Sequence, residues 1–279
     1  MHAATSILVG YNQTPEALAA FRWALESARL RHLPIHVVQA GRVAPHHGHD
    51  PDAPALTELA ARSVDWGMTI TTEQVPAGSV ADLAHAAGPD TILVIGARQA
   101  TSGLHALLGG STSATIREAA CPLVIARPAA HPSGPVVVGL SDHPESMQTL
   151  GWAFDHASRH HLALHAVHAY TQPVYTPDGA QESPAELAQR TTQVEDLLLH
   201  EEVAGFVELY PDVTLTSQAV HDSAAHALIQ ASQDASLVVM GTRAHSLVMA
   251  LLVGSPPQVV APRSPCSVAV IPHRGTAHE

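Results

Sequence analysis

The chain has 279 residues, of which 46% are hydrophobic and 14% charged, so it can bury the core of one large domain or two ordinary ones. The formal net charge is −12, and all 13 basic residues are arginine. This acidic surface without basic runs argues against nucleic acid or an anionic membrane as partner. The absence of lysine excludes lysine-containing phosphate loops and Schiff-base chemistry.

No apolar run approaches the ~18 residues that a membrane span needs, and the N-terminus has no signal-peptide pattern. We therefore expect a soluble, cytoplasmic protein. Two cysteines, Cys121 and Cys266, are too few for a disulfide framework.

Short Val/Ile/Leu-rich runs alternate with helical patterns along the first half of the chain, as in a parallel sheet covered by helices. Between the first two runs, Pro15 suits the first turn of a helix with Thr14 as its cap. Leu18, Phe21, Leu25 and Ala28 then share one helix face. The strands are expected at residues 5–10, 35–40, 69–75, 91–95 and 122–127.

The second half repeats this pattern. The stretch "ILVGYNQTPEALAAFRWALESA" (7–28) matches "VVVGLSDHPESMQTLGWAFDHA" (136–157), with Gly10 on Gly139 at an offset of 129 residues. Later segments match at an offset of 145, which indicates an insertion, placed at 169–184. The expected strands are residues 136–140, 163–169, 214–220, 236–240 and 267–271. Between them, one helix is expected to present a single face made by Leu187, Thr191, Val194 and Leu198.

The proline-rich stretch "RPAAHPSGP" (127–135) is the expected linker, which gives domains at 1–130 and 131–279. The fold class is α/β, with two tandem flavodoxin-like domains, each a five-stranded parallel sheet with helices on both faces. In such sheets a ligand lies at the carboxyl ends of the strands, where the strand order reverses. The turns after the first and fourth strands should meet there.

Several motifs resemble the universal stress protein family of the tandem type. They are the Val-Gly end of strand one, the Pro-containing start of an Ala/Trp-rich helix, the Gly-x-Arg after strand four, and a cysteine at the entry to strand five. The resemblance covers nearly the whole chain twice. It implies adenine nucleotide alpha hydrolase-like domains, pairing of the two fifth strands, a stress-response role through protein interaction, and a homodimer.

Nucleotide-binding members of that family carry Gly-x2-Gly-x9-Gly-Ser/Thr and an Asp after strand one. Glycines let the backbone amides approach phosphates, and hydroxyls donate further hydrogen bonds. The first half departs from this pattern at Gln99, where a glycine belongs, and at Asn12, where the Asp belongs. By resemblance, its candidate nucleotide residues are Asn12, Val37, Gly96, Arg98, Gly109, Gly110, Ser111 and Thr112.

The second half departs further. Ala244 replaces the second glycine, and Pro256 and Pro257 remove two backbone donors after the last glycine. Pro262 is expected to shorten or kink the next helix. The degenerate second site comprises Ser141, Gly241, Arg243, Gly254 and Ser255.

Three functions follow as hypotheses. The preferred one is a non-catalytic interaction protein with degenerate nucleotide sites, and the alternative is an ATP-binding switch in the first half. An adenylate-transferring enzyme is disfavoured because "GYNQTPEA" (10–17) has no basic or histidine phosphate signature. The loop "HHGHD" (46–50) has a metal-binding composition, but its spacing matches no closed site, so we expect a polar surface loop and no resident metal.

Overall fold

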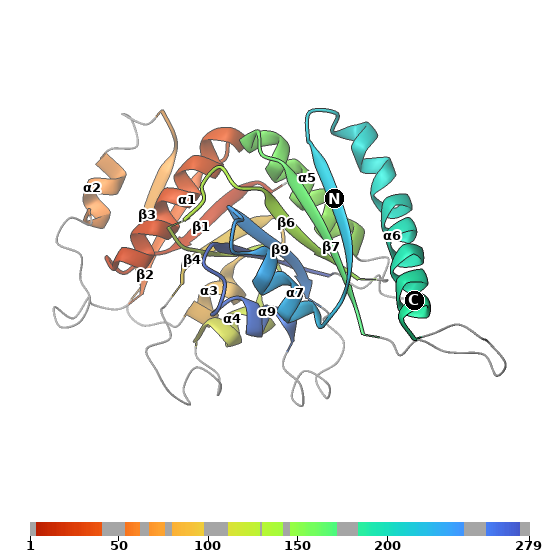
Figure 1. Ribbon diagram of the computed structural model, residues 1–279. Coiled ribbons are helices and arrows are strands. Elements are labelled where there is room, and N and C mark those ends of the chain that lie inside the picture. The colour runs from red at the N-terminus through yellow and green to blue at the C-terminus, as the bar shows by residue number, and fades with distance from the viewer. Residues whose placement is uncertain are drawn as a thin grey trace, which may run out of the picture.

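The computed structural model describes residues 4–40, 54–61, 67–75, 80–97, 111–128, 130–141, 146–171, 184–242 and 255–273. It shows one ten-stranded sheet in the order β3-β2-β1-β4-β5-β10-β9-β6-β7-β8, with helices against both faces (Figure 1). The order reverses between β1 and β4 in the first half and between β6 and β9 in the second. The α/β fold class expected from the sequence is confirmed.

The first half consists of residues up to Ala126 in the following elements. They are β1 (Ser6–Gly10), α1 (Pro15–Arg31), β2 (Ile35–Ala40), α2 (Leu56–Ala61), β3 (Ile70–Val75), α3 (Val80–Ala86), β4 (Thr91–Gly96), α4 (Ser111–Glu118) and β5 (Leu123–Ala126). All five strands lie where the sequence pattern placed them, to within a residue or two.

The second half repeats the order, again with all five strands in their expected places. Its elements are β6 (Val136–Leu140), α5 (Ser146–His160), β7 (Leu164–Tyr170), α6 (Pro184–Leu209), β8 (Leu215–His221), α7 (Ala224–Ala231), β9 (Leu237–Thr242), α9 (Pro256–Val260) and β10 (Ser267–Pro272). Most of the segment assigned to the insertion falls outside the described residues.

The two halves join through their fifth strands. β5 and β10 pair antiparallel, with Val124 opposite Ala269, whereas the other pairs in the sheet are parallel. This confirms the pairing that the family resemblance implied. Because the halves run in opposite directions, the carboxyl ends of the strands in one half lie at the edge where the strands of the other half begin.

Two cores lie on opposite faces of the sheet because side chains alternate along each strand. Val136 and Val138 belong to the core under α1, α2, α5 and α6, while Val137 belongs to the core under α3, α4, α7 and α9. Figure 1 shows these two groups of helices above and below the sheet. Cys121 and Cys266 are unbridged and buried in the second core, as expected for small apolar packing residues.

The start of α1 follows the sequence prediction. Thr14 is the N-cap, with its hydroxyl oxygen accepting a hydrogen bond from the Ala17 N–H at 3.2 Å, and Pro15 occupies the first helical position. Phe21 and Ala28 are buried, so the predicted helix face does pack on the sheet.

The predicted face of α6 does not pack on the sheet. Val194 and Leu198 are 50% and 54% exposed, whereas Leu199 and Val203 on the opposite side are buried. Thr191 is half-buried, and the side chain of Leu187 lies outside the described part. Helical periodicity identified an apolar stripe correctly, but this helix carries two stripes, and the sequence prediction chose the outward one.

Among the described residues, no helix combines the length and apolar character required to cross a bilayer.

Candidate functional site

In the first half, the candidate site lies at the carboxyl ends of β1 and β4, where the strand order reverses. β1 ends at Gly10 and β4 ends at Gly96, and the two strands are paired along their length. The turns that follow them therefore start side by side, as the sequence argument required.

Gly96 lets the end of β4 approach the first turn of α1. A Cβ atom at this position would lie 2.4 Å from the carbonyl oxygen of Glu16, closer than side chains tolerate. Glycine is needed here for packing whether or not a ligand binds, so its presence alone does not identify a phosphate site.

Asn12 lies exposed in the turn between β1 and α1. Its side-chain oxygen accepts a hydrogen bond from the Thr14 hydroxyl at 2.9 Å, which stabilises the turn in which Gln13 has a φ of 59°. An aspartate here would offer a second carboxylate oxygen to a ribose. Asn12 offers an amide N–H instead, because its one oxygen is already occupied.

The other candidates of the first half differ in how far the structure describes them. Val37 is fully buried opposite Val9, so its side chain contributes to the core. Ser111 and Thr112 form the first turn of α4 through their backbones. Arg98, Gly109 and Gly110 lie outside the described residues, as does the loop 46–50.

In the second half, the turn after β6 is closed by its own side chains. The hydroxyl of Ser146 donates to the carbonyl of Ser141 at 2.7 Å and accepts from its N–H at 3.0 Å. The two hydroxyl oxygens also lie 3.0 Å apart. Ser141, which corresponds to Asn12 at the offset of 129, therefore has its polar groups used locally.

A histidine packs beside Gly241 at the end of β9. The Nε2 atom of His273 lies 3.1 Å from the Thr149 hydroxyl of α5, and a Cβ on Gly241 would lie only 2.2 Å from that nitrogen. His273 and Thr149 are both buried. The carboxyl end of β9 is therefore packed against side chains of the chain itself.

The helix after the glycine segment also differs between the halves. Ser255 is the N-cap of α9 but makes no capping hydrogen bond through its side chain, and Pro256 and Pro257 form the first turn. At the offset of 145, these prolines correspond to Ser111 and Thr112. The first N–H groups of a helix have no intrahelical partner and can bind anions, but proline has none.

The helix α9 ends at Val260, before Pro262, so the predicted shortening is confirmed. Arg243 and Gly254 lie outside the described residues. Among the residues that are described, no three histidine, cysteine, aspartate or glutamate side chains gather into a metal-binding group.

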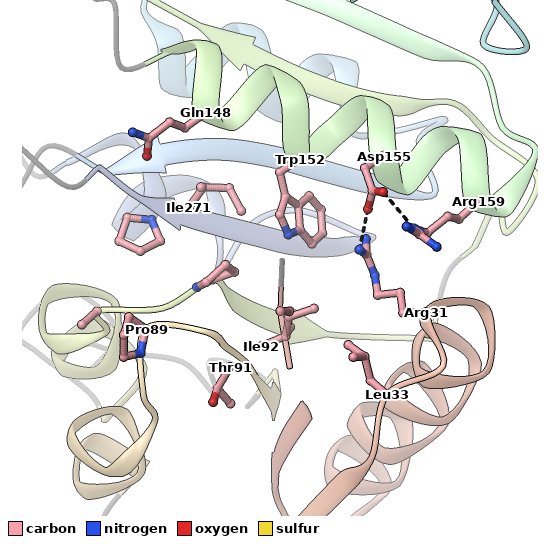
Figure 2. Close-up of a pocket in the computed structure, with 14 residues that line it drawn as sticks. Arg31, Leu33, Pro89, Thr91, Ile92, Gln148, Trp152, Asp155, Arg159 and Ile271 are labelled. Atoms are coloured by element: carbon pink, nitrogen blue, oxygen red, sulfur yellow. Dashed lines mark hydrogen bonds and ion pairs between the residues drawn. The ribbon is translucent and has the colours of Figure 1, made fainter. Parts of the chain in front are cut away.

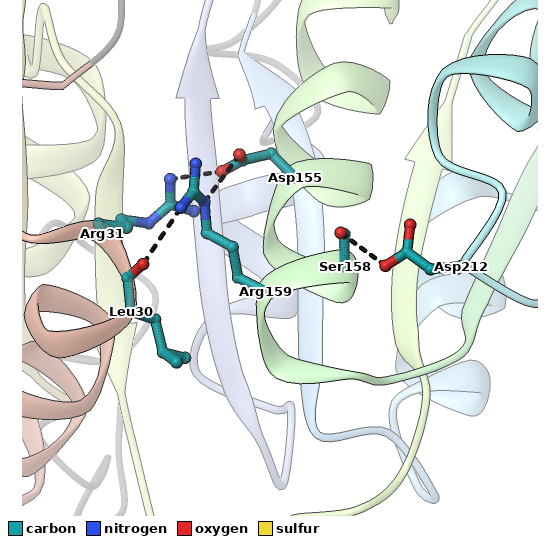
Figure 3. Close-up of polar contacts among 6 residues, drawn as sticks. All are labelled: Leu30, Arg31, Asp155, Ser158, Arg159 and Asp212. Carbon is teal, nitrogen blue, oxygen red and sulfur yellow. Dashed lines mark hydrogen bonds and ion pairs between the residues drawn. The ribbon is translucent and has the colours of Figure 1, made fainter.

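A polar contact that was not predicted from the sequence joins the halves at the ends of α1 and α5. Arg31 donates from Nη1 to the carboxylate of Asp155, which also accepts from Arg159 Nε at 2.8 Å (Figure 3). Arg159 further donates to the backbone carbonyl of Leu30 at 3.1 Å. Burial lowers the pKa of the Arg31 guanidinium, and the charge of Asp155 opposes that shift.

The repeat places a second ion pair beside the first. At the offset of 129, Glu26 corresponds to Asp155 and Arg31 to His160, and His160 Nδ1 lies 3.5 Å from a Glu26 carboxylate oxygen. An acid and a base recurring at one offset were the signal that could have revealed this contact from the sequence.

Between the two pairs, His156 is stacked with Trp23 and Trp152. The ring centroids are 5.8 Å and 5.3 Å apart, and the planes are nearly parallel. Burial holds the pKa of His156 well below its ordinary value, and the nearby charges of His160 and Arg31 lower it further. The imidazole is therefore neutral at neutral pH, where it serves as a flat packing surface.

The model of the universal stress protein family matches residues 4–127 and again residues 133–272. The chain belongs to the universal stress protein family. Two matches in one chain make it a tandem member.

Relatives of similar length support the assignment. Universal stress protein Rv2623 of Mycobacterium tuberculosis is 32% identical, with 96% of this chain and 97% of that protein covered. Universal stress protein Mb2028c of Mycobacterium bovis is 30% identical over 94% of this chain and 96% of its own length. Among solved structures, a universal stress protein from Archaeoglobus fulgidus has a TM-score of 0.70 at 16% identity, covering 98% of both chains.

Proposed function

We propose that this tandem universal stress protein is non-catalytic and acts through protein interaction, with a nucleotide site that is degenerate in both halves. The observation that carries the proposal is the start of α9. Pro256 and Pro257 stand where a phosphate-binding helix start needs free N–H groups.

Two further contacts support degeneracy in the second half. Ser146 occupies both backbone groups of Ser141, and His273 packs on Gly241. A nucleotide would have to displace the hydrogen bond between His273 and Thr149 as well as accept a helix start without donors. No such cost arises in a site that is built for phosphate.

The first half is weakened in a different way. Its turn after β1 is intact, but Asn12 commits its side-chain oxygen to Thr14. The substitutions at Gln99 and Gly110 depart from the family's nucleotide-binding pattern at two more positions. Asn12 and Gly110 each lack a polar group that the pattern supplies to nucleotide, and Gln99 adds a side chain where the pattern has only backbone.

The outward face of α6 supports a role through protein contacts. Val194, Leu197, Leu198 and Leu209 are 50%, 60%, 54% and 72% exposed. Exposed apolar side chains gathered on one element are typical of surfaces that bind other proteins. We propose that a homodimer forms through this face, since two copies of the same stripe are complementary under two-fold symmetry.

Isothermal titration of the purified full chain with ATP and Mg²⁺ tests the proposal. We expect no saturable heat and no thermal stabilisation up to about 1 mM nucleotide, which corresponds to a binding free energy weaker than about −4 kcal/mol. Binding of one equivalent or more per chain would overturn degeneracy.

A second candidate is an adenine nucleotide switch in the first half alone, in which Asn12, Val37, Gly96, Arg98, Gly109, Gly110, Ser111 and Thr112 hold the ligand. It is favoured by one observation, that α4 begins with Ser111 and Thr112, which carry the N–H groups that α9 lacks. If this switch exists, one equivalent of ATP binds and Thr112→Pro abolishes it. The matched variant Pro257→Thr, in the second half, would leave that binding unchanged.

A gain-of-function series separates the two candidates further. Combining Asn12→Asp, Gln99→Gly and Gly110→Ser restores the family pattern in the first half. The matched pair Ser141→Asp and Ala244→Gly does so only partly in the second half, where the prolines and His273 remain. If degeneracy is the cause of weak binding, the first set gains ATP affinity and the second does not.

A further inference from the structure

A cavity of about 390 Å³ lies between the two halves. None of the described candidate nucleotide residues lines it, although its lining residue Ile271 is paired with Gly241 of β9. Its first-half wall comes from the start of β4, the segment before β5, and the end of α1. Its second-half wall comes from α5 and the end of β10 (Figure 2). Volumes of this size are typical of small-molecule sites, which often form between domains.

Most of the wall is apolar. Leu33 and Ile92 face it from the first half and Ile271 from the second, with prolines completing the lining. Such a surface favours an apolar ligand body, because each Å² removed from water contributes about 25 cal/mol.

Trp152 supplies a hydrogen-bond donor inside this apolar wall. Figure 2 shows its indole projecting from α5 into the cavity. The residue as a whole is only 6% exposed. A donor that opens into the cavity is available to an acceptor from outside the chain.

The end of the cavity beside α1 carries a net positive charge. Arg31 and Arg159 share the single carboxylate of Asp155, and Nε and Nη2 of Arg31 have no hydrogen-bond partner among the residues described. Thr91 and Gln148 line the remaining polar positions. In a chain with a net charge of −12, this local excess of positive charge selects for an anion.

We propose that the cavity binds a small aromatic or branched monocarboxylic acid. The carboxylate lies beside Arg31 and Arg159 at the α1 end of the cavity, and the apolar body fills the part lined by Leu33, Ile92 and Trp152. One net positive charge matches one carboxylate, and guanidinium–carboxylate hydrogen bonds are strong in a partly dry site. A phosphate ester would bring more charge than the single excess arginine neutralises.

Calorimetric titration of the full chain with 1-naphthoate, beside the uncharged 1-naphthalenemethanol, tests this directly. We expect saturable binding of naphthoate at one equivalent, at least about tenfold tighter than the alcohol, since a hydrogen bond to a charged group contributes about that factor. Arg159→Gln should remove the preference for the acid. Arg29→Gln, which makes the same charge change at an exposed position outside the cavity lining, should keep it.

A steric variant places the binding in the cavity. Ala120 is exposed and lines the opening, so Ala120→Phe adds a ring there without disturbing the core. It should abolish naphthoate binding while the thermal midpoint stays at the wild-type value. Absence of saturable naphthoate binding to the wild type, equal binding of acid and alcohol, or unchanged affinity in Ala120→Phe would each overturn the proposal.

Discussion

Replacing Asp155 with alanine removes the carboxylate that joins α1 of the first half to α5 of the second. The side chains of Arg31 and Asp155 are only 11% and 16% exposed, so the variant leaves the Arg31 guanidinium largely buried without its counter-charge. Breaking a buried ion pair from one side costs about 3–5 kcal/mol. Because some water reaches this pair, we take the lower end, about 3 kcal/mol. The half-exposed contact from Arg159 adds less than about 0.5 kcal/mol.

Urea unfolding followed by circular dichroism measures this loss. With a denaturant slope of about 3 kcal/mol per molar, the midpoint of Asp155→Ala should fall by about 1 M. Asp212 offers a control of the same type. Its carboxylate accepts a hydrogen bond at 2.7 Å from Ser158, which lies on α5 as Asp155 does, but this contact is exposed on the surface (Figure 3). Asp212→Ala should cost less than about 1 kcal/mol. Equal losses in the two variants would refute the argument that the junction is a buried ion pair.

Three further outcomes are expected. Because the folded-state pKa of His156 is lowered, the unfolded chain binds the proton more readily than the folded chain. The contribution of His156 to the free energy of unfolding is therefore fully present above pH about 6.5 and falls below it, by up to about 1.4 kcal/mol per pH unit. His156→Phe should reduce this pH dependence, measured by urea titrations at pH 5.5 and 7.5. Gly96→Ala should lower the free energy of unfolding by about 1–3 kcal/mol, because the added Cβ meets the Glu16 backbone. Gly205→Ala on α6, where an added Cβ would have no heavy atom within 4 Å, should raise it by up to about 1 kcal/mol. Equal effects of the two substitutions would contradict the packing argument. Leu198→Glu on the outward face of α6 should convert the proposed dimer to a monomer, as measured by analytical ultracentrifugation. A wild-type protein that is already monomeric in that measurement would exclude the proposed homodimer.

The strands were predictable because each is a short apolar run that the sheet buries on both faces. The repeat supplied a second copy of each signal, and the start of α1 added a capping threonine followed by proline. The face of α6 was not predictable from periodicity, since Leu198 and Leu199 are adjacent and both apolar. Only the position of the sheet decides which of them is buried.

The candidate site was predictable in outline and not in detail. Spacing located Gly96 and Gly241 at the ends of their strands, yet nothing local to Gly241 indicates that His273, about thirty residues further on, would pack against it. The contact between Arg31 and Asp155 joins residues separated by 124 positions, so it depends on how the halves dock. Contacts of this kind require the tertiary arrangement.

The antiparallel junction of β5 with β10 has a consequence for how the halves could exist apart. Every residue of β5 is buried, and in a separated first half this apolar strand would become an exposed edge ready to pair with any neighbour. A separated half should therefore self-associate across β5 or precipitate. Joining two copies in one polypeptide keeps the matching strand at high effective concentration, so assembly of the central sheet no longer depends on how much protein the cell makes.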